Sequence, residues 1–236
     1  MRQENTKAFG FSGFVLKLIG VILMLLDHLY AFLPDMPLWL NYVGRASAPI
    51  FMYLSVEAFF HTSSRKNYLI RLYIAAAVML GIDLLLDITN NIFLTLAVGV
   101  SMMSCFEAYK KDRARYYPLI GGIIFGMLML LTEGSYYMLA VVLAFYLFRN
   151  HKVWMSAAYA ALYVGMPLYD ALANTGATLY ETLFLYNYQW MSLLALPLIL
   201  LYNGKPGPKT PAAKWMFYVI YPAHLIAFVL LGRVLM

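Results

Sequence analysis

Cysteine and charge are both scarce in this sequence. Cys105 is the only cysteine among 236 residues. It excludes an intramolecular disulfide and a zinc site built from several thiolates, because both need at least two sulfur atoms. Charged residues make up 12% of the chain, against about 25% in an average soluble protein. We therefore expect no bound metal, and we expect lipid rather than water around most of the surface.

Apolar residues take the place of the missing charges. They make up 63% of the chain, against roughly 45–50% in soluble proteins, and the mean hydropathy is +0.72. No stretch is polar enough to form a separate domain, so residues 1–236 are predicted to form a single integral membrane domain. Because backbone groups inside lipid must be hydrogen-bonded internally, the predicted fold class is all-α, a polytopic transmembrane helical bundle.

Apolar runs near the twenty residues that a helix needs to cross the hydrocarbon predict about nine spans. Only the turn Glu133-Gly134-Ser135 separates the fifth run from the sixth, and Gly165 and Pro167 interrupt the seventh. A count of eight or ten spans therefore also fits the pattern. The nine predicted centres lie near Leu23, Ala48, Val78, Val100, Phe125, Val142, Leu162, Leu196 and Leu225.

Lysine and arginine occur in alternate connections between these runs, and basic connections face the cytoplasm. The basic set is Arg2, Lys7, Lys17, Arg65, Lys66, Arg71, Lys110, Lys111, Arg113, Arg115, Arg149, Lys152, Lys205, Lys209 and Lys214. The other connections hold Asp35, Asp87, Glu133, Asp170 and Glu181. A multi-pass protein of the cytoplasmic (inner or plasma) membrane is predicted, with its N-terminus inside and its C-terminus outside; an even count of spans would bring the C-terminus inside. This placement explains the net charge of +6 without nucleic acid as a partner.

Ionisable side chains inside the predicted spans are candidates for a functional site, because charge is costly in hydrocarbon. His28, Arg45 and Asp83 fall roughly 6–9 Å below the outer boundary of three consecutive spans. Arg45 is the natural partner for an aspartate. An ion-pair network that only locks three helices together is the structural alternative. We favour a site, because such a lock has no need of His28, which exchanges protons near neutral pH.

A second histidine lies in the last predicted span. His224 falls near the membrane midplane, two residues after Pro222, which breaks the helical hydrogen-bond ladder and frees a carbonyl. A kinked polar helix of this kind often lines a cavity. A histidine that is merely hydrogen-bonded in the interior is the alternative interpretation.

Several short motifs, taken in order, resemble the TraX family over nearly the whole chain. The resemblance begins with Asp27-His28, Gly44-Arg45, Pro49-Ile50-Phe51, Glu57, His61-Thr62, Arg65-Lys66-x-Tyr68-x-x-Arg71 and Asp83. It continues with Asn91, Phe93-x-Thr95-Leu96, Glu133-Gly134, Tyr202-Asn203-Gly204-Lys205 with Gly207, and Tyr221-Pro222-x-His224. This family acetylates the N-terminal amine of F-type pilin subunits and is similar to the wider class of integral membrane acyltransferases.

The resemblance implies an acetyltransferase that uses acetyl-CoA from the cytoplasm. The acceptor would be an amine on the extracytoplasmic side, at a peptide N-terminus or on another small molecule. The expected catalytic residues are His28, Asp27, Arg45, Asp83, Glu133 and His224. The residues expected to bind the donor are Arg65, Lys66, Arg71, Asn203, Lys205 and His61.

Within this expectation, His28 acts as the general base, and Asp83 or Asp27 orients its imidazole. Arg45 either stabilises the oxyanion that forms on the thioester carbonyl or balances the carboxylates. Two other classes of protein also fit buried ionisable residues. One is a proton- or ion-coupled transporter, and the other is a non-catalytic membrane assembly factor whose polar layer is structural.

Overall fold

The computed structural model describes residues 10–173, 176–208 and 210–235. Within these ranges the chain is helical and forms no strand; its one β contact is an isolated bridge between Phe11 and Tyr202. The predicted all-helical fold is therefore confirmed. Arg2, Lys7 and Lys209, which the sequence placed in cytoplasmic connections, lie outside the described residues.

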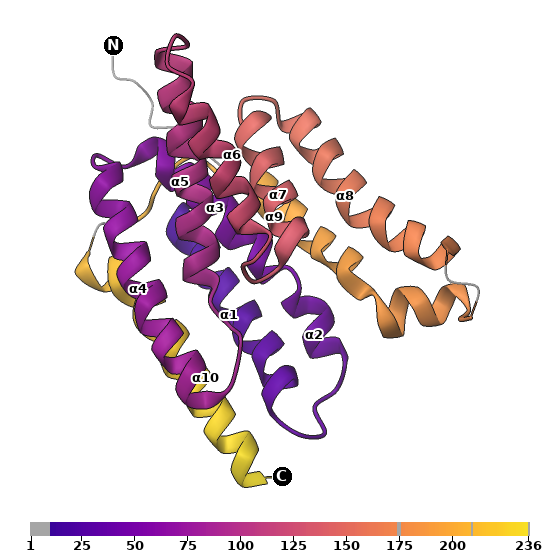
Figure 1. Ribbon diagram of the computed structural model, residues 1–236. Helices are drawn as coiled ribbons and strands as arrows, with labels where there is room; N and C mark the ends of the chain where they lie inside the picture. The colour runs from indigo at the N-terminus through magenta and orange to yellow at the C-terminus, as the bar shows by residue number, and fades with distance from the viewer. Residues whose placement is uncertain (1–9, 174–175, 209, 236) are drawn as a thin grey trace, which may run out of the picture.

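Figure 1 shows the arrangement of the helices. Near the middle lie α1 and α3, with α4 and α10 side by side on one flank and α8 with the segment leading into α9 on the other. In chain order the elements are α1 (Gly13–Phe32), α2 (Trp39–Gly44), α3 (Ser47–His61), α4 (Arg65–Leu86), α5 (Ile92–Lys111), α6 (Tyr117–Met129), α7 (Ser135–Leu147), α8 (Lys152–Ala173), the π-helix η1 (Glu181–Tyr186), the 3-10 helix η2 (Tyr188–Leu194), α9 (Ala195–Leu200) and α10 (Pro211–Leu235).

Four of the described helices are long and apolar enough to cross a membrane: α1, α4, α5 and α10, with 20, 22, 20 and 25 residues. Together with the apolar composition, they identify a helical membrane protein. The count of nine spans and the orientation of the termini stay predictions.

Helices α6 and α7 form a hairpin whose two arms are each shorter than the hydrocarbon layer is thick. Each has 13 residues, about 20 Å of helix, against a hydrocarbon thickness of about 30 Å. The turn between them stops well short of the lower ends of α4 and α10 (Figure 1). Its Glu133 carbonyl accepts a hydrogen bond from the buried Thr95 hydroxyl at 3.3 Å. Glu133 was predicted in an outer connection; the structure instead packs its turn against α5.

A proline divides the second predicted span into α2 and α3. Pro49 has no backbone N–H, so it cannot donate to the carbonyl of Arg45 four residues earlier. That carbonyl accepts the Ser192 hydroxyl from η2 at 3.1 Å instead. The interruption therefore places Arg45 at a junction between two helices and ties this junction to η2.

The loop at residues 203–207 fixes the start of α1. The carbonyls of Lys205 and Pro206 accept the first backbone N–H groups of α1, from Gly13 and Phe14, at 2.8 and 3.0 Å. Gly207 adopts a φ of +87°, and a Cβ there would lie 2.6 Å from the Phe14 Cβ. Only glycine suits this position, so the loop locks the helix that carries Asp27 and His28.

The contact between α1 and α2 predicts the effect of one substitution. A Cβ at Gly44 would lie 2.5 Å from the Asp27 Cβ and 2.7 Å from its Cα. We expect Gly44→Ala to lower the free energy of unfolding by about 1–3 kcal/mol, as overpacking commonly does. Gly81→Ala is the matched control, because a Cβ there meets no atom within 4 Å, and it should be neutral or stabilising by up to about 1 kcal/mol. Thermal unfolding in detergent measures both; equal stability of the two variants would contradict the packing argument.

Candidate active site

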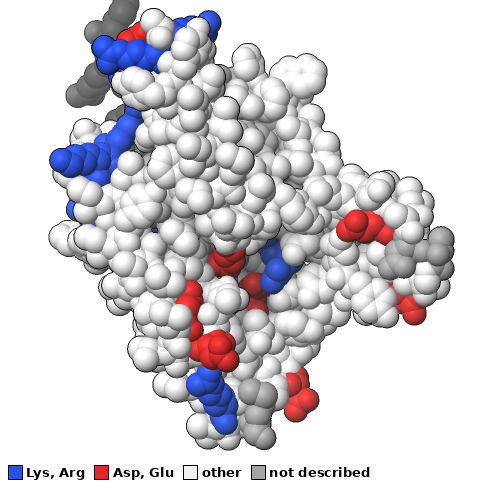
Figure 2. Space-filling view, viewed as in Figure 1, with Lys and Arg blue, Asp and Glu red and all other residues white. Residues whose placement is uncertain are grey.

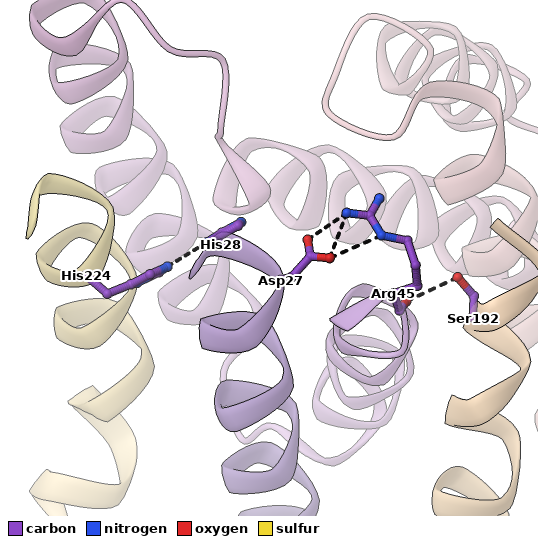
Figure 3. Close-up of polar contacts among 5 residues, drawn as sticks. All are labelled: Asp27, His28, Arg45, Ser192 and His224. Carbon is purple, nitrogen blue, oxygen red and sulfur yellow. Dashed lines mark hydrogen bonds and ion pairs between the residues drawn. The ribbon is translucent and has the colours of Figure 1, made fainter. Parts of the chain in front are cut away.

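Two histidines from opposite ends of the chain meet in the interior of the bundle. His28 on α1 and His224 on α10 are each only 7% exposed. The His28 Nδ1 lies 2.6 Å from the His224 Nε2, and the two ring planes differ by 7° (Figure 3). The sequence singled out both residues but placed His224 deeper, near the midplane. The structure joins them as one pair.

A backbone carbonyl determines how this pair is protonated. The His224 Nδ1 lies 2.8 Å from the carbonyl oxygen of Ile220, and a carbonyl can only accept a hydrogen bond. The His224 Nδ1 therefore carries a proton, so with both rings neutral its Nε2 accepts from the His28 Nδ1. This leaves the His28 Nε2 with a lone pair, and no described residue hydrogen-bonds to it. His28 is thus arranged as a base that His224 orients.

Neither aspartate holds the His28 ring, which corrects the expectation that Asp83 or Asp27 would orient it. Both carboxylate oxygens of Asp27 accept from Arg45, at 2.7 Å from Nη2, with a further contact of 3.1 Å from Nε (Figure 3). Asp83 Oδ1 accepts the backbone N–H of Asn90 at 3.3 Å. Consecutive helix positions point about 100° apart, so Asp27 and His28 face different neighbours.

Glu133 completes the polar layer from the α6–α7 turn. Its Oε2 is buried and has no hydrogen-bond partner among the described residues. Its carboxyl group lies within electrostatic range of those of Asp83 and Asp27 and of the Arg45 guanidinium. The hydroxyl of Tyr221, one turn before His224, accepts the backbone N–H of Ile92 at 3.4 Å beside it.

The layer contains more acidic groups than basic ones. Asp27, Asp83 and Glu133 face a single guanidinium, that of Arg45, which donates to Asp27 through Nε and Nη2. The side chains of Arg45 and Asp27 remain 26% and 15% exposed. In the space-filling view, acidic and basic atoms are visible together in a hollow near the middle of one face (Figure 2). The arrangement favours a positively charged ligand that reaches the layer through this hollow.

Buried polar groups on the far side of Arg45 were missed by the sequence analysis. Asn41, Tyr137 and Tyr163 are 3%, 9% and 1% exposed, yet Asn41 Oδ1 and both hydroxyls lack a well-formed hydrogen bond among the described residues. Tyr163 lies within electrostatic range of Arg45 and stacks on Tyr137 with 5.6 Å between ring centroids. In the sequence these residues look like ordinary aromatic and amide positions, and only their burial distinguishes them.

The residues predicted to bind the donor do not form one cluster. Arg65 and Lys66 line a groove on the outer face of α4. The His61 Nδ1 bonds the Glu57 carbonyl at 2.8 Å, and the Glu57 carboxylate is paired with Arg149 at 2.8 Å. His61 is therefore joined to a partly buried ion pair between α3 and the residues that follow α7.

Asn203, Lys205 and Arg71 differ in how far their polar atoms are engaged. Asn203 accepts the backbone N–H of Lys205 through Oδ1 and donates to the Gly10 carbonyl through Nδ2, at 3.0 and 3.1 Å. Lys205 is exposed. Arg71 lies over the Tyr68 ring, and its buried Nε has no hydrogen-bond partner among the described residues. Arg71 and Lys205 therefore keep donors for an anionic ligand, whereas the Asn203 side chain secures its own loop.

The fold and the site are those of a helical membrane protein whose interior holds a histidine pair next to a layer of carboxylates and one arginine. The chain belongs to the TraX family. The family model described as "TraX protein" matches residues 12–232, a range that includes every predicted site residue.

A curated protein of Dichelobacter nodosus is similar over almost its full length. It is described as "Probable fimbrial assembly protein FimC, serogroup H1" and is 27% identical over 235 residues, covering 91% of this chain and 93% of that protein. No solved structure matches the chain.

The pair of Asp27 and Arg45 leads to a prediction about stability. Breaking a buried ion pair by removing one charge typically costs about 3–5 kcal/mol, because the remaining charge stays buried without a partner. Since this pair is partly exposed, we expect Asp27→Asn to lose a smaller amount, about 2–3 kcal/mol. A double-mutant cycle of Asp27→Asn with Arg45→Met, measured by unfolding in detergent, gives the coupling. Additive losses in the double variant would show that the two side chains do not stabilise each other.

Proposed function

We propose that this protein is a membrane-embedded N-acetyltransferase. It moves an acetyl group from cytoplasmic acetyl-CoA to an amine on the extracytoplasmic side, at a peptide N-terminus or on another amine-bearing molecule. The observation that carries the proposal is the contact of His28 Nδ1 with His224 Nε2, together with that of His224 Nδ1 with the Ile220 carbonyl. With both rings neutral, these contacts leave the His28 Nε2 free to act as a base. Membership of the TraX family and similarity to a fimbrial assembly protein favour an acceptor that belongs to a pilus.

The reaction needs one base and no covalent enzyme intermediate. The His28 Nε2 takes a proton from the acceptor amine, whose nitrogen attacks the thioester carbonyl carbon and forms the new C–N bond. The C–S bond then breaks, the acetyl group stays on nitrogen as an amide, and the CoA thiolate receives the proton from the His28 imidazolium. Proton transfer of this kind contributes about 10²–10⁴-fold to rate.

The polar layer serves the two substrates differently. The Arg45 Nη1 has no partner among the described residues, so it is free to donate to the oxyanion of the tetrahedral intermediate while Asp27 holds the guanidinium in place. The surplus negative charge of Asp83 and Glu133 suits an acceptor that arrives as an ammonium ion. The acceptor passes this extra proton to one of these two carboxylates before it attacks. The His28 Nε2 therefore stays free for the second proton, which leaves nitrogen as the C–N bond forms.

We propose the orientation that the charges of the connections favour, in a cytoplasmic membrane. The N-terminus lies in the cytoplasm, nine apolar segments enter the membrane, and the C-terminus lies outside. The segments around α6 and α7 enter without crossing. On this orientation Arg71, Lys205, His61 and Asn203 lie on the donor side, and we assign the phosphates of CoA to Arg71 and Lys205, which keep unpaired donors.

Donor binding is the first test. We expect the purified protein in detergent to bind acetyl-CoA and CoA but not ATP, measured by isothermal titration calorimetry. The reason is that the proposed site contacts the whole donor and not only its nucleotide part. Binding of ATP with equal affinity would indicate a general attraction of anions to the basic face. Clear absence of CoA binding in well-folded protein would count against an acyltransferase.

Removing the base should stop the chemistry and leave donor binding intact. We expect His28→Ala to lower the rate of acetyl transfer to a peptide N-terminus by at least about 10²-fold, with unchanged calorimetric binding of acetyl-CoA. His151→Ala is the matched control, because His151 is exposed at the start of α8. Retained turnover in His28→Ala would remove His28 from the mechanism.

Proton- or ion-coupled transport is the second candidate, favoured by one observation. Asp83 and Glu133 form no ion pair among the described residues, and unpaired intramembrane carboxylates are common in proton pathways. Reconstituted liposomes distinguish the two functions, since a transporter moves protons or ions across the bilayer without any acetyl-CoA.

A further inference from the structure

A groove of about 690 Å³ runs along the outside of the bundle between α4 and α5, away from the polar layer. One end carries two cations, Arg65 and Lys66, and the rest is almost entirely apolar. The lining residues beyond the cations are Leu69, Ile70, Tyr73, Ile74, Ala77 and Ser104.

The groove faces the surroundings of the bundle and not the His28 site. Ile70 and Ile74, which line it, are 45% and 61% exposed. The opposite side of α4 carries Leu72, Met79 and Asp83, which are 2%, 0% and 8% exposed and point into the bundle. In a membrane protein the outer side of such a helix contacts lipid. A ligand in this groove therefore lies in the hydrocarbon and has no path along α4 to His28.

The charged end of the groove has unused hydrogen-bond donors. The Arg65 guanidinium lies 4.2 Å from the Phe59 ring centroid, and its Nε donates to the Phe59 carbonyl at 3.3 Å. These contacts hold the group in place and leave both terminal nitrogens without a partner among the described residues. Among the described residues, neither Arg65 nor Lys66 forms an ion pair with a carboxylate.

We propose that this groove binds one anionic phospholipid from the cytoplasmic leaflet. Its phosphate lies between Arg65 and Lys66, and one acyl chain follows the apolar floor from Leu69 to Ala77, eight residues or about 12 Å along α4. Cations at one end of an apolar groove match the two parts of a phospholipid, and basic pockets on the cytoplasmic side commonly bind anionic headgroups. The inference rests on the proposed orientation and not on the acetyltransferase activity.

In this groove the lipid contacts Arg65 and Lys66, which were predicted to bind acetyl-CoA. A phosphate of CoA and a phospholipid headgroup present the same chemistry to Arg65 and Lys66. The apolar floor favours the lipid, because CoA is polar along most of its length and the groove leads away from the proposed reacting centre.

The test measures binding of phosphatidylglycerol to the delipidated full chain in a neutral detergent, by native mass spectrometry and by thermal stabilisation. Phosphatidylcholine is the headgroup control, and CoA is offered as a competitor. We expect the double variant Arg65→Gln, Lys66→Gln to lose about 30-fold in affinity for phosphatidylglycerol, from two cations near the surface. Lys111→Gln with Arg113→Gln is the matched control, because these two basic residues are also on the predicted cytoplasmic side and are exposed.

A third variant tests the groove without altering charge. Ala77→Phe fills the apolar end and should also weaken phosphatidylglycerol binding, and it keeps the proposal testable if the double variant does not fold. Three results would overturn the inference: equal binding of phosphatidylcholine, equal losses in the Lys111 and Arg113 control, or displacement of the lipid by CoA together with loss of acetyl-CoA binding in the double variant. Unchanged acetyl transfer in Ala77→Phe would separate this site from the catalytic one.

Discussion

The close contact of Asp27 with Arg45 is the interaction on which the site depends, because a charge in a membrane interior is costly and a well-matched partner lowers that cost. Other features of the site contribute to this contact. Gly44 lets α2 approach α1 without a side chain, and Pro49 ends the helical ladder beside Arg45 so that Ser192 can bind its carbonyl. While Asp27 contacts Arg45, its neighbour His28 lies about 100° further around α1 and faces α10.

His28 then depends on α10 for its partner. His224 sits on the last helix, so the pair forms only when the two ends of the chain pack together. The loop at residues 203–207 helps by holding the start of α1 just before α10 begins. A chain that crosses the membrane several times thus builds its central pair from its first and last helices, with the acidic groups arriving from α4 and from the α6–α7 turn.

Much of this was readable from the sequence, because intramembrane charge is rare enough to be noticed. The all-helical membrane fold, the shared layer of His28, Arg45 and Asp83, and the pairing of Arg45 with an aspartate follow from apolar runs and helix geometry. The contact of His224 with His28 was not readable, because the tilt and crossing of α1 and α10 decide it. The depth of Glu133 was not readable either. Hydropathy identifies an apolar run, but it does not show that two helices of 13 residues end inside the bundle. Asn41 and Tyr163 lack any sequence signal at all.

In the proposed orientation, the turn of the short α6–α7 hairpin lies closer to one surface of the bilayer than to the other. Its helices extend about 20 Å from one side, which leaves about 10 Å of a hydrocarbon layer of about 30 Å between the Glu133 turn and the opposite surface. In the proposed orientation that opposite surface is the outer one. An extended peptide advances about 3.3 Å per residue, so roughly three residues of an acceptor need to leave the water to bring its terminal amine to the level of this turn. The proposed acetyl transfer would then need only a flexible end of a folded protein and would not draw the rest of it into the membrane.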